Sequence, residues 1–187
     1  MASLSSPRHG SATVSLVLGG ARSGKSRFAE NLLEAYAGQR IYLATAEPGD
    51  EEMRTRIADH RQRRGEGWRT VEAPLDVASA ITGAGEDAVL LDCLTLWLAN
   101  LMSGGRDIRE ATEGLGKALA GARAPVVLVS NEVGLGIVPD NPLARAFRDH
   151  AGRLNQTMAA LADRVFFLAA GLPMTLKDRA CMKEGAA

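Results

Sequence analysis

The sequence has few of the residues that mark several classes of protein. Its 187 residues include two cysteines, Cys93 and Cys181, which lie far apart and form no metal-ligand spacing. We therefore expect neither a disulfide framework nor a zinc site, and the composition fits a reducing cytoplasm. Lys+Arg and Asp+Glu both number 22, so net charge gives no reason to expect binding to nucleic acid or to an acidic membrane surface. No apolar run approaches the roughly 18 residues that a membrane-spanning helix requires.

The remaining composition is that of an ordinary soluble globular protein, with 46% hydrophobic and 24% charged residues. The first twelve residues are rich in serine and lack the apolar core of a secretory signal. We predict a flexible tail over residues 1–12 and a single domain over residues 13–187, since this length suits one hydrophobic core.

One short stretch has the spacing of a phosphate-binding loop, G-x-x-x-x-G-K-S/T. It consists of Gly19, Gly20, Ala21, Arg22, Ser23, Gly24, Lys25 and Ser26. The apolar run 13–18 before it predicts a buried strand, and the periodic stretch 27–36 after it predicts a helix. In such a loop glycines let the backbone N–H groups surround phosphates at a helix N-terminus. Lys25 would then reach the outer phosphates and the Ser26 hydroxyl would ligate Mg²⁺, so the stretch predicts nucleotide binding.

Strands and helices alternate along the rest of the chain. Apolar or alternating runs predict further strands at 40–46, 68–72, 88–92, 125–131 and, as the final strand, 165–169. Helical patterns occupy 51–64, 75–81, 94–102, 107–122 and a long stretch from residue 143. This alternation predicts an α/β fold of the P-loop NTPase, RecA-like type, in which helices cover both faces of a mostly parallel central sheet. The ligand would bind at the carboxyl ends of the strands.

Asp92 ends a predicted buried strand and has two interpretations. As the acidic residue of a P-loop site it would hold Mg²⁺ beside Ser26. Alternatively, it would cap the helix predicted to start near Leu94. At the ends of other strands, Glu72 is a candidate for nucleobase or ribose contacts or for capping a turn, and Asn131 and Glu132 are candidate substrate contacts.

His60 also has two interpretations. Arg56, His60 and Arg64 are four residues apart and share one face of the charged predicted helix, with Arg63 close by. Neighbouring cations favour a neutral imidazole, which is a competent nucleophile toward phosphorus, and the same cations attract polyphosphate. The alternative is a solvated helix surface with an incidental histidine.

Several motifs together resemble a known enzyme family. They occupy residues 19–27, 41–46, 56–61, 68–72 and 90–95, followed by 127–139 (VLVSNEVGLGIVP) and 143–156 (LARAFRDHAGRLNQ). In this order they resemble the bifunctional adenosylcobinamide kinase / adenosylcobinamide-phosphate guanylyltransferase of cobalamin biosynthesis. The resemblance covers about residues 14–177, and its segment 131–156 is more specific than the phosphate-binding loop.

The resemblance implies two reactions and a set of functional residues. ATP or GTP would phosphorylate adenosylcobinamide, and GMP from GTP would pass through a histidine to adenosylcobinamide phosphate. Lys25 would be catalytic, the guanylylated histidine would be His60, and Ser26 and Asp92 would hold Mg²⁺. Nucleotide contacts, besides residues 19–26, would fall on Ala44, Thr45, Ala46, Arg61, Gln62, Arg63, Arg64, Glu72 and Asp92. The family also implies a homotrimer.

Two other functions compete with this assignment. A simple P-loop kinase of small molecules would leave His60 idle, and radiolabel from α-labelled GTP would then not stay on the denatured protein. A nucleotide-switch binding module would order its loops through the γ-phosphate. The sequence contains no N-K-x-D run for guanine recognition, so a switch of that kind would need other residues to select the base.

Overall fold

The computed structural model describes residues 12–46 and 67–179. The tail predicted for residues 1–12 lies almost wholly outside this part, as does the charged helix predicted over residues 51–64. No helix in the part described is long and apolar enough to cross a membrane.

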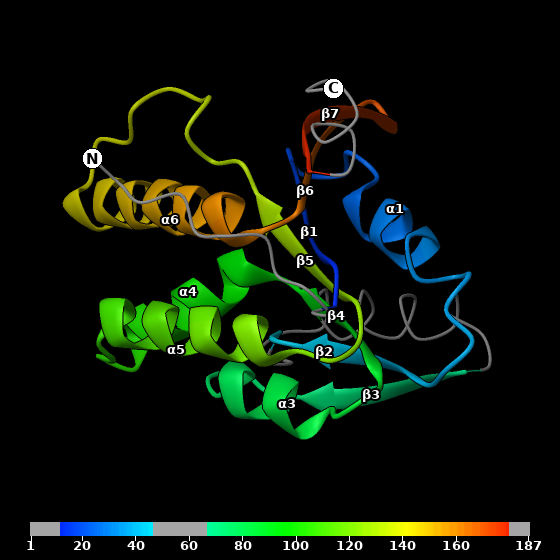
Figure 1. Ribbon diagram of the computed structural model, residues 1–187. Coiled ribbons are helices and arrows are strands. Elements are labelled where there is room, and N and C mark those ends of the chain that lie inside the picture. The colour runs from blue at the N-terminus through cyan, green and yellow to red at the C-terminus, as the bar shows by residue number, and fades with distance from the viewer. Residues whose placement is uncertain (1–11, 47–66, 180–187) are drawn as a thin grey trace.

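A seven-stranded sheet forms the centre of the molecule (Figure 1). Its strands, in spatial order β3-β2-β4-β5-β1-β6-β7, are parallel except β7, which runs antiparallel to β6. They are β1 (Val14–Gly19), β2 (Arg40–Ala44), β3 (Trp68–Glu72), β4 (Ala88–Asp92), β5 (Val126–Asn131), β6 (Arg164–Ala169) and β7 (Leu172–Asp178). The apolar runs of β1, β2, β4 and β5 are buried almost throughout, as parallel strands covered on both faces require.

Helices cover both faces of the sheet unequally. They are α1 (Lys25–Asn31), α3 (Val77–Gly83), α4 (Leu94–Ser103), α5 (Ile108–Gly121) and α6 (Pro142–Leu161). Alternate residues of each central strand point to opposite sides: Leu16 belongs to a core that includes residues of α3, α4, α5 and α6, whereas Val17 belongs to a second core that includes residues of α1. Figure 1 shows α1 on the other side of the sheet from α4, α5 and α6. Trp97 of α4 is buried in the larger of these two cores, and its indole N–H donates to the Leu75 carbonyl at 2.8 Å. The predicted α/β architecture is confirmed.

The prediction that the strand at 165–169 is the last one was wrong, because β7 follows it. Ala170 and Gly171 have φ values of 52° and 80° and form a two-residue connection between β6 and β7. Positive φ at both central residues is the geometry that lets two antiparallel strands turn tightly into one another. The added strand therefore forms the antiparallel edge of the sheet.

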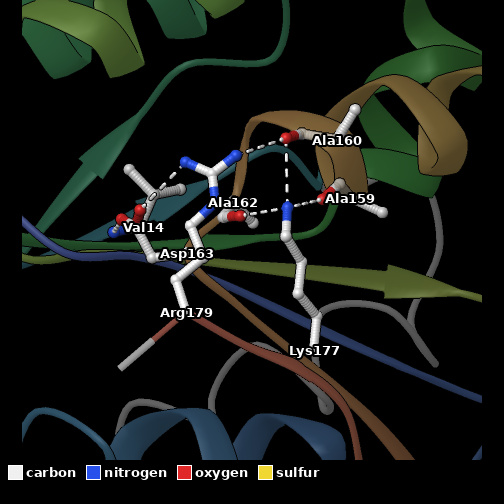
Figure 2. Close-up of polar contacts among 7 residues, drawn as sticks. All are labelled: Val14, Ala159, Ala160, Ala162, Asp163, Lys177 and Arg179. Carbon is white, nitrogen blue, oxygen red and sulfur yellow. Dashed lines mark hydrogen bonds and ion pairs between the residues drawn. The ribbon is translucent and has the colours of Figure 1, made fainter. Parts of the chain in front are cut away.

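Polar contacts fasten the end of β7 to α6 and β1 (Figure 2). The Lys177 ammonium donates to three carbonyls near the C-terminal end of α6, those of Ala159, Ala160 and Ala162, at 2.8, 3.1 and 2.6 Å. The Arg179 guanidinium lies 3.5 Å from the Asp163 carboxylate, which also accepts the N–H of Val14 at 2.9 Å. The Lys177 contacts satisfy carbonyls that the last turn of a helix leaves without intrahelical partners.

Candidate active site

The phosphate-binding loop runs from Gly19, at the end of β1, to Lys25, the first residue of α1. A Cβ atom on Gly19 would lie 2.5 Å from the carbonyl oxygen of Leu168 in the neighbouring β6, so the two backbones approach too closely for a side chain. Arg22 and Gly24 have φ values of 55° and 96°, which let the chain turn sharply into the helix. The structure thus has the strand–loop–helix arrangement that the sequence pattern predicts.

Two backbone hydrogen bonds anchor this loop to the rest of the sheet. The Gly19 carbonyl accepts the N–H of Glu132, just after β5, at 3.0 Å. The Ser23 carbonyl accepts the N–H of Gly171, in the turn between β6 and β7, at 3.0 Å. Residues 20–22 between these anchors are exposed. The loop is therefore held at both ends and open to solvent between them.

Lys25 points back into the loop instead of outward. It is 7% exposed, and its ammonium donates to the Gly20 carbonyl and lies 3.5 Å from the Ser23 hydroxyl. Burial lowers the pKa of Lys25 below its usual value of 10.5, while the neighbouring Cys93 and Asp92 act electrostatically in the opposite direction. Anionic phosphates at the loop would offset the cost of burying this cation.

Asp92 lies at the carboxyl end of β4, half-buried, and its Oδ2 accepts the hydroxyl of Tyr42 at 3.0 Å. The capping interpretation fails because Cys93 occupies the N-cap of α4 and no side-chain capping bond forms there. Ser26 is half-buried in the first turn of α1. The described part of the chain has no group of three or more His, Cys, Asp or Glu residues suited to a metal. One carboxylate and one hydroxyl do fit Mg²⁺, which takes few protein ligands when it also binds nucleotide phosphates.

Ala44 is the last residue of β2, and Thr45 and Ala46 follow it. This segment lies beside the end of β4, where Ala44 is the register partner of Asp92. Thr45 is fully buried, and its hydroxyl accepts the N–H and donates to the carbonyl of Cys93, both at 2.8 Å. The Thr45 carbonyl accepts the side-chain amide of Asn100 at 2.8 Å. Since these groups are engaged within the protein, Thr45 fixes the position of the segment, whereas Ala46 is half-buried and closer to solvent.

Glu72 is exposed at the end of β3, opposite Ala44 in the sheet register. Because β3 is an edge strand and four inter-strand steps of about 4.8 Å separate it from β1, Glu72 lies roughly 19 Å from the phosphate-binding loop. The phosphates of a nucleotide bound at the loop would not reach Glu72, so only its base or ribose end would.

The remaining predicted site residues lie outside the described part of the chain. They are His60, Arg61, Gln62, Arg63 and Arg64.

A buried polar network, which the sequence interpretation largely missed, joins α4, β5 and α6 beside the loop. The Thr95 hydroxyl accepts the N–H of Asn131 at 2.7 Å and lies 3.4 Å from the Ser130 hydroxyl. The Asn155 amide donates to the Asn131 carbonyl at 3.3 Å, and the Asn131 amide approaches the sulfur of Cys93 at 4.0 Å. Asn131 was a predicted substrate contact, whereas Thr95 and Asn155 had no predicted role. A polar residue at position 155, directly after the apolar residue 154 on the buried face of the helix, was the signal available.

Comparison with protein families identifies relatives of the chain over most of its length. The family described as "Cobinamide kinase / cobinamide phosphate guanyltransferase" matches residues 15–176. The chain is 47% identical over 166 residues to the "Bifunctional adenosylcobalamin biosynthesis protein CobP" of Pseudomonas aeruginosa, covering 87% of this chain and 96% of that protein. It is 44% identical over 179 residues to the "Bifunctional adenosylcobalamin biosynthesis protein CobU" of Salmonella typhimurium, covering 87% of this chain and 98% of that protein.

The fold is also similar to that of a solved ATPase from the type III secretion system of pathogenic bacteria. The TM-score is 0.56 at 12% sequence identity, and the match covers 87% of this chain and 56% of that one. This likeness supports the assignment of a P-loop ATPase-type fold.

Proposed function

Because this chain belongs to the family of cobinamide kinases and cobinamide phosphate guanylyltransferases, we propose that it makes adenosyl-GDP-cobinamide in two steps through a guanylylated His60. At the coarser level the chain is a bifunctional kinase and guanylyltransferase of adenosylcobalamin biosynthesis, and such an enzyme acts on nucleotide substrates.

The first step is phosphoryl transfer. The aminopropanol hydroxyl oxygen of adenosylcobinamide attacks the γ-phosphorus of ATP or GTP, the bond to the β,γ-bridging oxygen breaks, and the nucleoside diphosphate leaves while the hydroxyl proton is lost. Charge builds up on the leaving phosphates, so positioned donors and cations accelerate the reaction. Lys25 and the backbone N–H groups of residues 19–26 are the groups that would act here.

The second step is nucleotidyl transfer. An imidazole nitrogen of His60 attacks the α-phosphorus of GTP, and pyrophosphate leaves. A phosphate oxygen of adenosylcobinamide phosphate then attacks the same phosphorus, which breaks the N–P bond and regenerates the histidine. Splitting one displacement into two through a nitrogen nucleophile gives a reactive intermediate.

The observation that carries this proposal is the arrangement of Lys25 and Asp92. Lys25 is buried inside the phosphate-binding loop, and Asp92 is close enough to act on its pKa. β1 and β4 both run parallel to β5, which lies between them, so Gly19 and Asp92 end their strands at the same edge of the sheet. A cation, an acid and loop amides at one sheet edge form the arrangement that phosphoryl transfer requires.

Ser26 and Asp92 are the residues that would hold Mg²⁺. When bound, the ion would neutralise charge on the phosphates. The chain itself would hold Asp92 in place through Tyr42, which donates to its carboxylate.

We assign nucleotide contacts to Ala44, Ala46, Glu72 and the four residues 61–64 on the family resemblance. The buried Thr45 would hold this segment in position without touching the nucleotide. We assign a cytoplasmic location on the low cysteine content. Exposed apolar side chains are consistent with assembly into a homotrimer. These side chains are Leu135, Ile137, Val138 and Leu143, whose exposed fractions are 81, 97, 61 and 71%. Large exposed apolar side chains gathered in one segment are typical of association sites.

The test is incubation with α-³²P-GTP and Mg²⁺, followed by denaturing gel electrophoresis. Wild type should retain label that is labile in acid and stable in alkali, as a phosphoramidate is. His60→Ala should retain none, while His150→Ala, which changes a half-buried histidine of α6, should label like wild type. Transfer of γ-phosphate to adenosylcobinamide should survive in His60→Ala.

Absence of label on folded, GTP-binding wild type would reduce the function to a kinase. Label that persists in His60→Ala would move the covalent step to another residue.

A further inference from the structure

Both backbone groups of Asn131 are held by side chains from other elements. Its N–H donates to the Thr95 hydroxyl of α4 at 2.7 Å, and its carbonyl accepts the Asn155 amide of α6 at 3.3 Å. Asn131 is the last residue of β5, where the ladder of the parallel sheet ends. The position of this one residue is therefore fixed from two helices.

Holding Asn131 in this way requires buried polar groups. Thr95, Ser130 and Asn155 are 8, 2 and 6% exposed, and the Asn155 Oδ1 is buried with no hydrogen-bond partner among the described residues. Buried polar groups cost free energy unless they are fully paired, so the unpaired Asn155 Oδ1 is a cost that this network carries. What the network does provide is a defined position for Asn131.

The position so defined is beside the phosphate-binding loop. Asn131 is the register partner of Gly19, and the next residue, Glu132, donates its N–H to the Gly19 carbonyl at 3.0 Å. On its other side, the Asn131 amide nitrogen lies 4.0 Å from the sulfur of Cys93, which follows Asp92. A thiol sulfur is a weak acceptor, so this amide would readily donate to a stronger one.

We propose that the side-chain amide of Asn131 donates a hydrogen bond to the terminal phosphate of the bound nucleoside triphosphate, with Thr95 and Asn155 as positioning residues that hold it there. The inference rests on the proposed function, since it takes the nucleoside triphosphate as substrate. β5 lies between the strands that end at Gly19 and Asp92, and the phosphate that faces both the loop and the metal-holding acid is the outermost one. A neutral donor on that phosphate distinguishes triphosphate from diphosphate.

The experiment compares the Kd of a non-hydrolysable GTP analogue with that of GDP, each with Mg²⁺ and without corrinoid. Asn131→Ala should weaken analogue binding roughly ten- to hundredfold, the range for a hydrogen bond to a charged group, and leave the GDP Kd within about twofold. Asn131→Leu keeps the approximate shape and removes the donor, so it should behave in the same way and decides the question if the alanine variant does not fold. Gln156→Ala, an exposed neighbour of Asn155, is the matched control and should change neither Kd.

The positioning role has its own readout. Asn155→Ala and Thr95→Val should each reduce the ratio of the GDP Kd to the analogue Kd by a smaller factor. Combining either with Asn131→Ala should add nothing further to the loss, because both act through the same amide. A purely structural role would weaken both nucleotides equally and would leave the ratio unchanged.

An unchanged ratio in folded Asn131→Ala or Asn131→Leu would overturn the inference, as would equal loss of both nucleotides. That result is distinct from failure of the proposed function, in which wild type would show no covalent label on His60. Wild type that labels His60 while Asn131 variants keep the ratio would leave the proposed function intact and refute only the role of Asn131.

Discussion

Replacing Gly19 with alanine should destabilise the protein, whereas the same change at Gly20 should not. A Cβ atom on Gly19 would lie 2.5 Å from the Leu168 carbonyl oxygen and 2.8 Å from the Ser23 hydroxyl. Leu168 is the register partner of Gly19 in β6, so its carbonyl cannot turn away without disturbing the sheet. A Cβ atom on Gly20 would meet nothing within 4 Å.

The expected size follows from the cost of overpacking. Forcing an extra carbon into a packed site costs about 1–3 kcal/mol when backbone must shift. For a chain of this size each kcal/mol lowers Tm by roughly 2–4 °C, so Gly19→Ala should lower Tm by roughly 2–12 °C. Gly20→Ala restricts the unfolded chain without a clash, which should stabilise by about 0.4–1 kcal/mol and leave Tm unchanged or slightly raised.

The assay is thermal unfolding followed by circular dichroism, without nucleotide, on wild type and both variants. GTP binding by calorimetry should in addition weaken in Gly19→Ala, because displacing β1 from β6 moves the start of the loop. If Gly20→Ala lowers Tm as much as Gly19→Ala, or if Gly19→Ala melts within about 1 °C of wild type, the close approach of Gly19 to Leu168 does not limit stability.

Two further predictions concern other parts of the fold. Lys177→Met removes the donor to three carbonyls at the C-terminal end of α6 and should destabilise by about 2 kcal/mol, measured as a urea midpoint shift. Lys117→Met, on an exposed position of α5, should change stability by less than about 0.5 kcal/mol, and equal effects of the two would contradict the role of the contacts. Burial and Asp92 raise the pKa of Cys93 to about 11, so at pH 8 only about one thiol in a thousand is ionised. Iodoacetamide should therefore leave Cys93 unmodified in the native protein and modify it in urea, as measured by peptide mass spectrometry; comparable rates in both states would contradict its burial.

The parallel core of the sheet could be predicted because its strands are short apolar runs. β7 could not be predicted as a buried apolar run, since Leu172, Met174 and Leu176 are exposed and are separated by Pro173 and Thr175. Its alternating pattern and the Gly171 turn were visible in the sequence, but Pro173 argues against a strand except at an edge. β7 is an edge strand, so the proline is tolerated.

Two helices differ from what helix propensity or periodicity alone predicts. α5 contains Gly114 and Gly116, which lower helix propensity. A Cβ atom at Gly116 would lie 3.2 Å from Leu161 of α6, so the missing side chain lets the two helices approach. α1 ends at Asn31, five residues before the predicted end, because the following bonds run from each N–H to the carbonyl three residues earlier, as in Tyr36 to Leu33.

Local sequence pattern predicts one part of the candidate site, and tertiary contacts determine the rest. The loop 19–26 was recognisable because its glycines, lysine and serine are adjacent in sequence. The bonds from Asn131 to Thr95 and Asn155 join residues 36 and 24 positions apart, and no local pattern specifies which polar residues meet. Only the sheet register and the packing of α4 and α6 bring them together.

Buried hydrogen bonds at the two ends of the sheet have different consequences for function. At the end where β1 begins, Asp163 and Lys177 hold backbone groups of β1 and α6, and none of these groups lies near the phosphate-binding loop. At the carboxyl end, the bonds of Asn131 hold a residue beside Gly19. Weakening the first set should therefore lower Tm and leave nucleotide discrimination unchanged, whereas weakening the second should change discrimination even at temperatures well below Tm, where the variant is fully folded. Measuring both quantities on Lys177→Met and Asn155→Ala separates stability from positioning, because only the asparagine variant should change the ratio of the two nucleotide affinities.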